Sequence, residues 1–136
     1  MIVACDGAAR GNPGPAGIGV QITDGDGSVL AEIAEGLGET TNNVAEYTAV
    51  IEGLRRAHEL GARSVLLRSD SQLLINQLTG RYRVRSAHLQ PLHRQVRDLA
   101  SAFDDVEFRH VRRERNTEAD RLANEGVDAW LADRRG

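Results

Sequence analysis

Residues 2–33 read IVACDGAARGNPGPAGIGVQITDGDGSVLAEI, and this stretch decides the first half of the fold. A short apolar run at 2–5 precedes two runs in which apolar residues alternate, at 18–22 and 29–33. The segment Asp24-Gly25-Asp26-Gly27 separates these two runs as a turn. Alternation with a period of two places every second side chain on one face of a sheet. The pattern therefore predicts three consecutive antiparallel strands.

The period changes after residue 40. Large residues recur at helical spacing from Val44 to His58, after the capping residues Thr41-Asn42-Asn43, and Gly61 ends this segment. The uninterrupted apolar run at 65–67 is typical of a central strand that is covered on both faces. The remaining pattern predicts a short helix at 71–78, a helix at 89–103, a strand at 106–110 and a helix at 122–131.

The resulting order of elements is βββαβααβα, which places the chain in the α/β class. Strands that follow helices imply parallel crossovers, so we expect a mixed five-stranded sheet flanked by helices. With 136 residues and no internal repeat or linker, the chain has the length of one domain. We expect that domain to cover residues 1–131, followed by a short C-terminal tail at 132–136.

The composition is that of an ordinary globular protein, with 40% hydrophobic and 27% charged residues. No apolar stretch is long enough to cross a bilayer, so we expect no contact with membranes. The start of the chain lacks the basic segment and apolar core of a secretory signal, and a lone Cys5 cannot form an internal disulfide. We therefore expect a cytoplasmic protein, and a monomer.

The net charge is −3, yet the positive charge is concentrated in one part of the chain. All 17 basic residues are arginines, and nine of them lie within residues 79–115. A polyanion responds to the local potential, so a mildly acidic protein can still present a basic face to phosphates. On charge alone, an ordinary solvated surface is the simpler interpretation.

Four acidic residues stand at the ends of predicted elements. Asp6 and Asp70 end the first and fourth strands, Glu46 falls in the first turn of a helix, and Asp120 lies near the start of the last helix. If the two strands are adjacent and parallel, their carboxylates leave the sheet at the same edge. Converging carboxylates repel one another and favour a hard dication such as Mg²⁺. Two such ions could activate a water for phosphodiester cleavage, although any one of these acids alone could be a helix cap.

Four motifs resemble those of type 1 ribonuclease H, which hydrolyses the RNA strand of an RNA/DNA hybrid. Residues 6–17 (DGAARGNPGPAG) resemble the opening signature of that family, and residues 40–46 (TTNNVAE) resemble its second motif. Residues 69–71 (SDS) and 110–120 (HVRRERNTEAD) resemble the third and the last. All four occur in the order of the family, over about residues 1–130.

The resemblance implies catalytic roles for specific residues. It assigns the two Mg²⁺ ions, for which Mn²⁺ is a possible substitute, to Asp6, Glu46, Asp70 and Asp120, with Asp6 bridging the ions. It places His110 on a mobile loop beside the site, where the imidazole would help with the attacking water, proton transfer or product departure. The other histidines, His58, His88 and His93, match no motif, and we expect structural or surface roles for them.

The resemblance also implies contacts with the substrate. Amide groups can both donate and accept, as recognition of a ribose 2′-hydroxyl requires. By analogy, Thr41 and Asn42 resemble positions that hold a phosphate of the DNA strand. The candidates for contacts at or near the scissile ribose are Gly11, Asn12, Asn43, Gln72 and Asn116.

The chain departs from some members of the family between residues 80 and 89. This segment is too short for the additional helix and the Lys-rich protrusion with which those members bind the hybrid. The chain therefore resembles the shorter branch of the family, which lacks the protrusion. Arg81, Arg83 and Arg85, together with Tyr82, could partly substitute through phosphate contacts and stacking. Some shorter relatives are the N-terminal part of a protein with a phosphatase-like second domain.

The sequence therefore predicts an endoribonuclease that cuts the RNA strand of hybrids and leaves 5′-phosphate and 3′-hydroxyl ends. Two alternatives remain: a DNA-directed nuclease related to integrases, and a non-catalytic module that binds hybrids. Matched hybrid, DNA and RNA duplexes would separate the three. We expect Cys5 and Trp130 to pack in the core.

Overall fold

The computed structural model describes residues 1–135, and its elements follow the predicted βββαβααβα order. The first half contains β1 (Ile2–Ala9), β2 (Gly14–Thr23), β3 (Val29–Thr40), α1 (Asn42–Glu59) and β4 (Ser64–Ser69). The second half contains α2 (Gln72–Leu78), α3 (Gln90–Ala100), β5 (Asp105–His110), a 3₁₀ turn η1 (Arg113–Arg115) and α4 (Thr117–Arg135).

The five strands form one mixed sheet in the order β3-β2-β1-β4-β5. The first three strands are antiparallel, whereas β4 runs parallel to both β1 and β5. The prediction that β1 and β4 are adjacent and parallel is confirmed. Their pairing is short, from Ile2 opposite Leu66 to Ala4 opposite Arg68, so β1 extends well beyond the end of β4.

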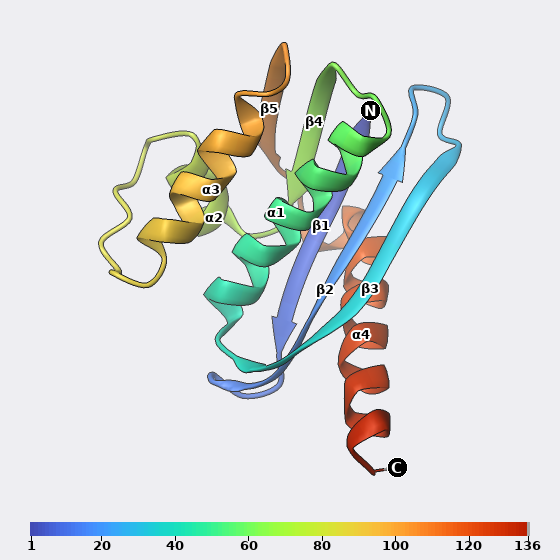
Figure 1. Ribbon diagram of the computed structural model, residues 1–136, viewed down its shortest axis with the longest axis vertical. Coiled ribbons are helices and arrows are strands. Elements are labelled where there is room, and N and C mark those ends of the chain that lie inside the picture. The colour runs from blue at the N-terminus through green and yellow to red at the C-terminus, as the bar shows by residue number, and fades with distance from the viewer. Residues whose placement is uncertain (136) are drawn as a thin grey trace.

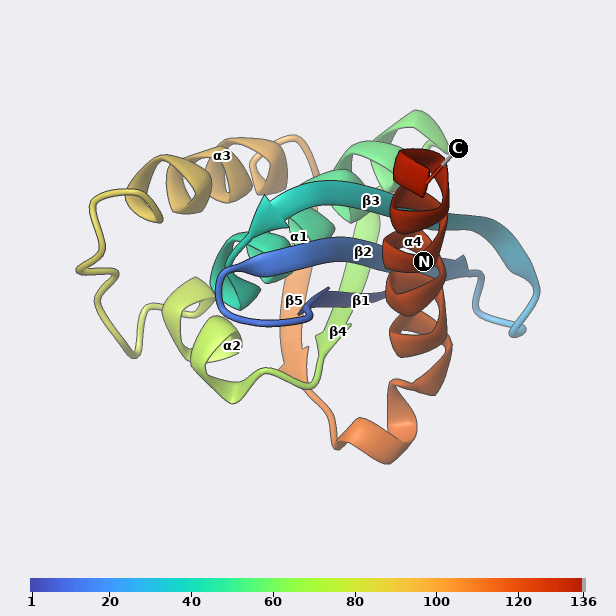
Figure 2. The same cartoon turned by 90° about the horizontal axis from the view of Figure 1, so that it is seen from below.

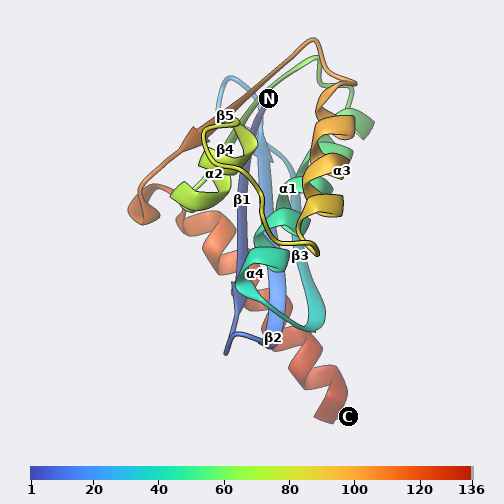
Figure 3. The ribbon, with the colours of Figure 1, turned by 90° about the vertical axis from the view of Figure 1, so that its left-hand side faces the viewer.

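The helices cover both faces of the sheet. In Figure 1, α1 lies in front of the sheet, with α3 beside it, and α4 lies behind β2 and β3. Figure 2 shows the turn between β1 and β2 at the same end of the molecule as the start of α1 and α2. In Figure 3, the segment after β5 projects on the side of the sheet opposite α1 and α3.

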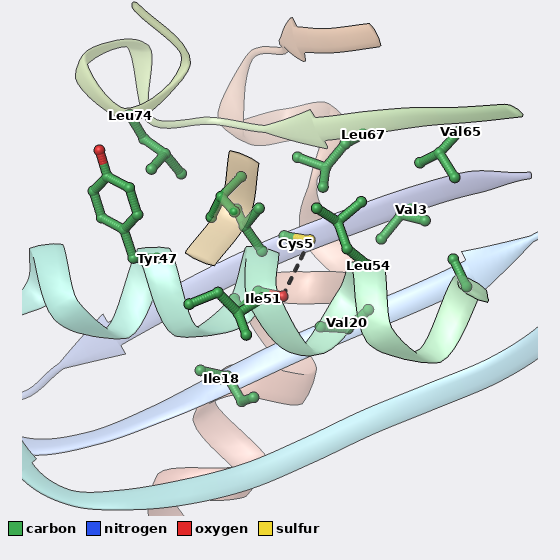
Figure 4. Packing of buried hydrophobic residues seen from close by; sticks show 14 of the residues in the cluster. Val3, Cys5, Ile18, Val20, Tyr47, Ile51, Leu54, Val65, Leu67 and Leu74 are labelled. Carbon is green, nitrogen blue, oxygen red and sulfur yellow. Dashed lines mark hydrogen bonds between the residues drawn. The ribbon is translucent and has the colours of Figure 1, made fainter. Parts of the chain in front are cut away.

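The main core lies between α1 and the sheet and is almost entirely aliphatic (Figure 4). Cys5 is buried there, as expected, and its thiol donates to the carbonyl oxygen of Ala49 at 3.6 Å. Burial raises the pKa of this thiol, which suits packing and not thiol chemistry. Trp130 is only half-buried: it packs over Gly36 of β3, and the guanidinium of Arg134 lies 4.7 Å from its ring.

The strands are longer than the alternating pattern predicts. β1 continues to Ala9, β2 begins at Gly14 and β3 ends at Thr40, so most of the glycine-rich first motif is part of the sheet. Residues this small carry no apolar alternation, which is why periodicity missed them. They are needed because both faces are approached closely: a Cβ at Gly17 would lie 2.7 Å from the carbonyl oxygen of Ala123 on α4.

The segment expected to be a C-terminal tail, 132–136, is helical in its first four residues. Helix α4 begins at Thr117 and continues without interruption to Arg135, so residues 132–135 belong to the helix. Residue 136 lies outside the described part of the chain. None of the helices in residues 1–135 has the length and apolar character that a membrane crossing requires.

Candidate active site

Two of the acids lie where β4 stops pairing with β1. Asp70 directly follows β4, as predicted. Asp6 is not at a strand end, because β1 continues past it to Ala9 while paired with β2. Asp6 nevertheless lies two residues beyond the last β1 position that pairs with β4, which is Ala4. The two carboxylates therefore still leave the sheet at the same edge.

The other two acids are brought in by helices that approach the sheet at glycines. Glu46 lies just after the first turn of α1, and a Cβ on Gly7 would collide with the backbone of Ala45 and Glu46. Asp120 lies in the first turn of α4, next to Ala119, whose carbonyl oxygen would collide with a Cβ on Gly19. Because these glycines lack side chains, both helices pack tightly enough to bring their acids beside Asp6.

All four acids line one cleft of about 590 Å³. The same cleft is lined by Asn42, Ser71 and Arg113. The sequence thus predicted which carboxylates share a site. It did not single out Ser71 or Arg113, although both stand within the motifs that were recognised.

The acids hold one another in an unfavourable electrostatic state. Burial, followed by the charge of Asp70 and by a hydrogen bond and repulsion from Asp120, raises the pKa of Asp6 from 3.8 to about 8. A hydrogen bond between two carboxyl groups requires a proton on one of them. Without a cation, the site therefore retains a proton at neutral pH.

Glu46 and Asp70 are affected in the same direction. Burial raises the pKa of Glu46, and a hydrogen bond from Ser71 partly offsets this effect. Burial also raises the pKa of Asp70, while the charges of Arg113 and His110 oppose that rise. Arg113 and His110 thus lie close enough to Asp70 to stabilise its ionised form.

The residues fit a divalent cation by their chemistry. All four side chains offer carboxylate oxygens, which Mg²⁺ prefers, and Oε2 of Glu46 is buried without a hydrogen-bond partner. Within residues 1–135, no three His, Cys, Asp or Glu side chains are grouped closely enough to enclose an ion as they stand. The carboxylates share a cleft in which they repel one another, and a dication would cancel that repulsion.

His110 is the last residue of β5 and pairs with Ser69, so the expectation that it lies on a mobile loop is wrong. The strand extends to His110 because the next residue, Val111, still donates to the carbonyl oxygen of Ser69 at 2.9 Å. The side chain is exposed and influences Asp70. It is thus held at the rim of the cleft by the sheet.

The start of α1 is tied to the turn between β1 and β2 by two asparagines. Oδ1 of Asn42 accepts from the backbone N–H of Ala9 at 2.8 Å, and Oδ1 of Asn12 accepts from the backbone N–H of Asn42 at 3.1 Å. Thr41 caps the helix, with its hydroxyl oxygen accepting from the N–H of Val44 at 3.3 Å. These candidates for substrate contact therefore also have structural roles.

A smaller hollow of about 180 Å³ adjoins this region. It brings Asn12, Thr41 and Asn43 together with Ser86 and His88, which come from the segment between α2 and α3. Gln72 is exposed at the first residue of α2, and Gly11 lies in the turn after β1 with a φ of 100°.

Asn116 does not stand where a substrate contact was expected. It is only 2% exposed, and its Nδ2 donates to the carbonyl oxygen of Cys5 at 2.9 Å. Its own backbone carbonyl accepts from the N–H of Asp120 at 3.1 Å. The structure thus makes Asn116 a buried link between β1 and the start of α4, on either side of the acidic cleft.

Two of the remaining histidines have structural contacts, as expected. A ring nitrogen of His93 lies 3.1 Å from the carbonyl oxygen of Gln77, and the ring packs edge-on against Tyr47. His58 packs edge-on against Phe103. His88 instead lines the small hollow beside Thr41.

Comparisons with known proteins agree with this geometry. The family described as "Reverse transcriptase-like" matches residues 4–126. The bifunctional protein Rv2228c of Mycobacterium tuberculosis is 45% identical over 95% of this chain, which spans only 36% of that relative. A crystal structure of LC11-RNase H1 in complex with an RNA/DNA hybrid has a TM-score of 0.91 at 41% identity, covering 96% of this chain and 98% of that one.

A further relative matches along almost its entire length. The ribonuclease H of Halorhodospira halophila is 37% identical over 93% of this chain and 92% of its own. An alignment this complete leaves no other domain to account for the likeness. Together with the shared fold, it shows that this chain belongs to the type 1 ribonuclease H family.

Proposed function

We propose that this chain is an endonuclease that hydrolyses the RNA strand of RNA/DNA hybrids. One observation carries the proposal: Asp6 on β1, Glu46 on α1, Asp70 just after β4 and Asp120 on α4 line one cleft, where burial and the other three acids raise the pKa of Asp6 to about 8. A stable fold gains nothing from such repulsion, whereas a dication site requires it. The hybrid bound to the related LC11-RNase H1 supports this choice of substrate.

The four carboxylates would hold two Mg²⁺ ions, with Mn²⁺ as a substitute. When bound, these ions supply polarisation of the scissile phosphate and activation of the attacking water. Asp6 is the proposed bridge, because it is the acid whose pKa responds to all three of the others.

The neighbouring cations balance charge and move protons. Arg113 lines the cleft and favours the ionised form of Asp70. An imidazole can accept and release protons under physiological conditions, so His110 at the rim would exchange protons with the attacking water or the leaving 3′-oxygen. Because water attacks and the 2′-hydroxyl does not, the products carry a 5′-phosphate and a 3′-hydroxyl, without a cyclic phosphate.

Recognition of the hybrid would fall to the polar groups beside the cleft. We assign contacts with ribose hydroxyls to Asn12, Asn43 and Gln72, with Gly11 contributing its backbone, because these groups can donate to or accept from a 2′-hydroxyl. Thr41 and Asn42 would hold a phosphate of the DNA strand. The arginines of the segment between α2 and α3 would add phosphate contacts.

We also propose that the protein acts as a monomer in the cytoplasm. The one cysteine of the sequence is a free, buried thiol, and the proposal rests on this lack of a disulfide, which suits a reducing compartment. Size-exclusion chromatography at several concentrations tests the oligomeric state.

The central test is cleavage of matched end-labelled duplexes in titrated Mg²⁺ and Mn²⁺. We expect the RNA strand of the hybrid to be cut, with chelation abolishing the reaction. Asp70→Asn should lose activity, whereas Asp98→Asn, at an exposed position on α3, should not. Cleavage of duplex DNA would favour the integrase-like alternative, and hybrid binding without cleavage would favour the non-catalytic module.

A further inference from the structure

A second basic surface lies on the part of the sheet that α4 leaves open. Helix α4 packs against glycines of β2 and β3, at the far side of the sheet from β5. On β4 and β5, Leu67 and Phe108 pack toward the core, so their neighbours Arg68 and Arg109 point to the opposite face. These two arginines line a hollow of about 620 Å³ together with Arg112 and Arg115, which follow β5.

The arginine hollow, as we call this surface, carries an excess of positive charge, with four arginines and one glutamate in its lining. Arg68 and Arg109 are directly opposite each other in the parallel ladder, and like charges in such positions destabilise a sheet. Arg109 forms an ion pair with Glu107, and Glu114 also lines the hollow. Arg68 has no such pair among the described residues, and its Nε is buried without a hydrogen-bond partner. An anion in the hollow would balance the charge of Arg68.

The hollow adjoins the acidic cleft. The turn η1 separates the two surfaces: Arg113 lines the cleft, whereas Arg112 and Arg115 line the hollow. His110 lines the hollow and also influences Asp70 in the cleft. A strand that leaves the cleft past His110 therefore reaches the hollow next.

We propose that the arginine hollow binds backbone phosphates of the RNA strand beyond the point of cleavage. This inference rests on the proposed function, because the strand whose phosphate enters the carboxylate cleft is the one that continues past His110. Guanidinium groups suit the role, since their paired N–H donors match two phosphate oxygens. The hollow would thus lengthen the footprint on RNA without contacting the scissile phosphate.

The test compares hybrids of different length by fluorescence anisotropy. A short hybrid is titrated beside the same hybrid with a single-stranded extension of its RNA strand at one end or the other, and beside hybrids with matched extensions of the DNA strand. Titrations use an Asp70→Asn background so that the RNA stays intact. The variant is Arg112→Ala with Arg115→Ala; the matched control, Arg55→Ala with Arg56→Ala, removes two exposed arginines from α1.

In the parent background, we expect one RNA extension to tighten binding. The hollow variant should lose that gain, and its affinity for the extended hybrid should be about tenfold weaker at low salt. The slope of log affinity against log salt should fall by about 1.4, or about 0.7 for each lost contact with a single strand. The control should keep the gain. Equal gains in variant and control, no gain from extending the RNA strand in the parent, or an equal gain from extending the DNA strand would each overturn the inference.

The two proposals can fail separately. If the wild-type chain does not cut hybrids in Mg²⁺, the proposed function is wrong, and the titrations still report whether the hollow binds RNA. Thermal unfolding of the double variant, compared with the parent, excludes misfolding as the cause of a loss, and Arg112→Lys with Arg115→Lys should restore part of the gain because it restores charge.

Discussion

Asp6 and Gly19 are paired across β1 and β2, so the acid at the centre of the cleft stands beside a residue that lets α4 approach. The first turn of α4 lies directly over Gly19, where a Cβ would collide with the carbonyl oxygen of Ala119 and the N–H of Ala123. Asp120 follows Ala119 in the chain. The approach of helix to strand thus determines how close Asp120 comes to Asp6.

Gly19→Ala should therefore damage both stability and activity. The new methyl group forces α4 away from the sheet, and overpacking of this kind costs about 1–3 kcal/mol in the free energy of unfolding. Activity should fall further than the folded fraction explains, since Asp120 moves with the helix. Urea unfolding and cleavage rates measure the two effects. Gly25→Ala is the control, because a Cβ there meets no atom within 4 Å; equal effects of both substitutions would contradict the explanation.

The repulsion in the cleft predicts how stability depends on pH without metal. The unfolded chain ionises Asp6 above its ordinary pKa of 3.8, whereas the folded chain keeps the proton until about pH 8. A folded pKa raised in this way means that the free energy of unfolding falls as pH rises between these values. Glu46 and Asp70 act in the same direction.

Asp6→Asn should remove much of the loss of stability that occurs in the metal-free protein as pH rises. In EDTA near neutral pH, we expect the variant to be more stable than the parent by on the order of 2 kcal/mol, and the difference to shrink toward pH 4. Denaturant unfolding across the pH range measures it, with Asp98→Asn as a control. Mg²⁺ should stabilise the parent more than the variant, because it binds the folded cleft. A parallel pH profile for parent and variant would contradict the assignment.

Alanine variants of Asn116 and Asn43 should differ in opposite ways: the first should lose stability, and the second should lose affinity for the substrate. Asn116→Ala leaves the carbonyl oxygen of Cys5 without its donor in the core, which costs about 1–3 kcal/mol of stability. Asn43 is exposed beside Thr41, so Asn43→Ala should leave stability nearly unchanged and raise KM for hybrids. Unfolding curves and steady-state kinetics distinguish the two. A raised KM with normal stability for Asn116→Ala would restore the substrate role expected from its motif.

The sequence predicted the order of elements and the four carboxylates, but not how these groups are supported. Alternating and helical patterns identify elements with large apolar residues, so the cores of β2, α1 and β4 were found. The extension of β1 to Ala9 was missed because small residues give no period. The alternation at 106–110 correctly predicted a strand that ends at His110, whereas the mobile loop that the resemblance implied for this residue is wrong, because β4 holds the end of β5 through the carbonyl of Ser69.

Burial explains the other differences. Asn116 has the residue type of a substrate contact, and only the packing of β1 against α4 shows that it is buried. The sequence alone likewise does not show that the arginines of the hollow share one surface. Arg68 and Arg109 are about forty residues apart, and they meet because β4 and β5 pair in parallel.

The chain's two tyrosines offer a last test, of the contact between α1 and α2. Tyr47 is buried, and its hydroxyl donates to Oε1 of Gln77 at 2.6 Å. Burial, and then the charge of Glu46, raises the pKa of Tyr47 from 10.0 to about 12. The unfolded chain therefore loses this proton near pH 10 and the folded chain only near pH 12, so stability should fall as pH rises through that window.

Tyr47→Phe should lower stability at neutral pH by about 1 kcal/mol through the lost hydrogen bond. It should also flatten the decline of stability at alkaline pH. Tyr82 is 54% exposed, so Tyr82→Phe is the control and should keep the decline of the parent. Unfolding curves between pH 8 and the alkaline limit measure both, and an unchanged decline in Tyr47→Phe would show that Tyr47 does not cause it.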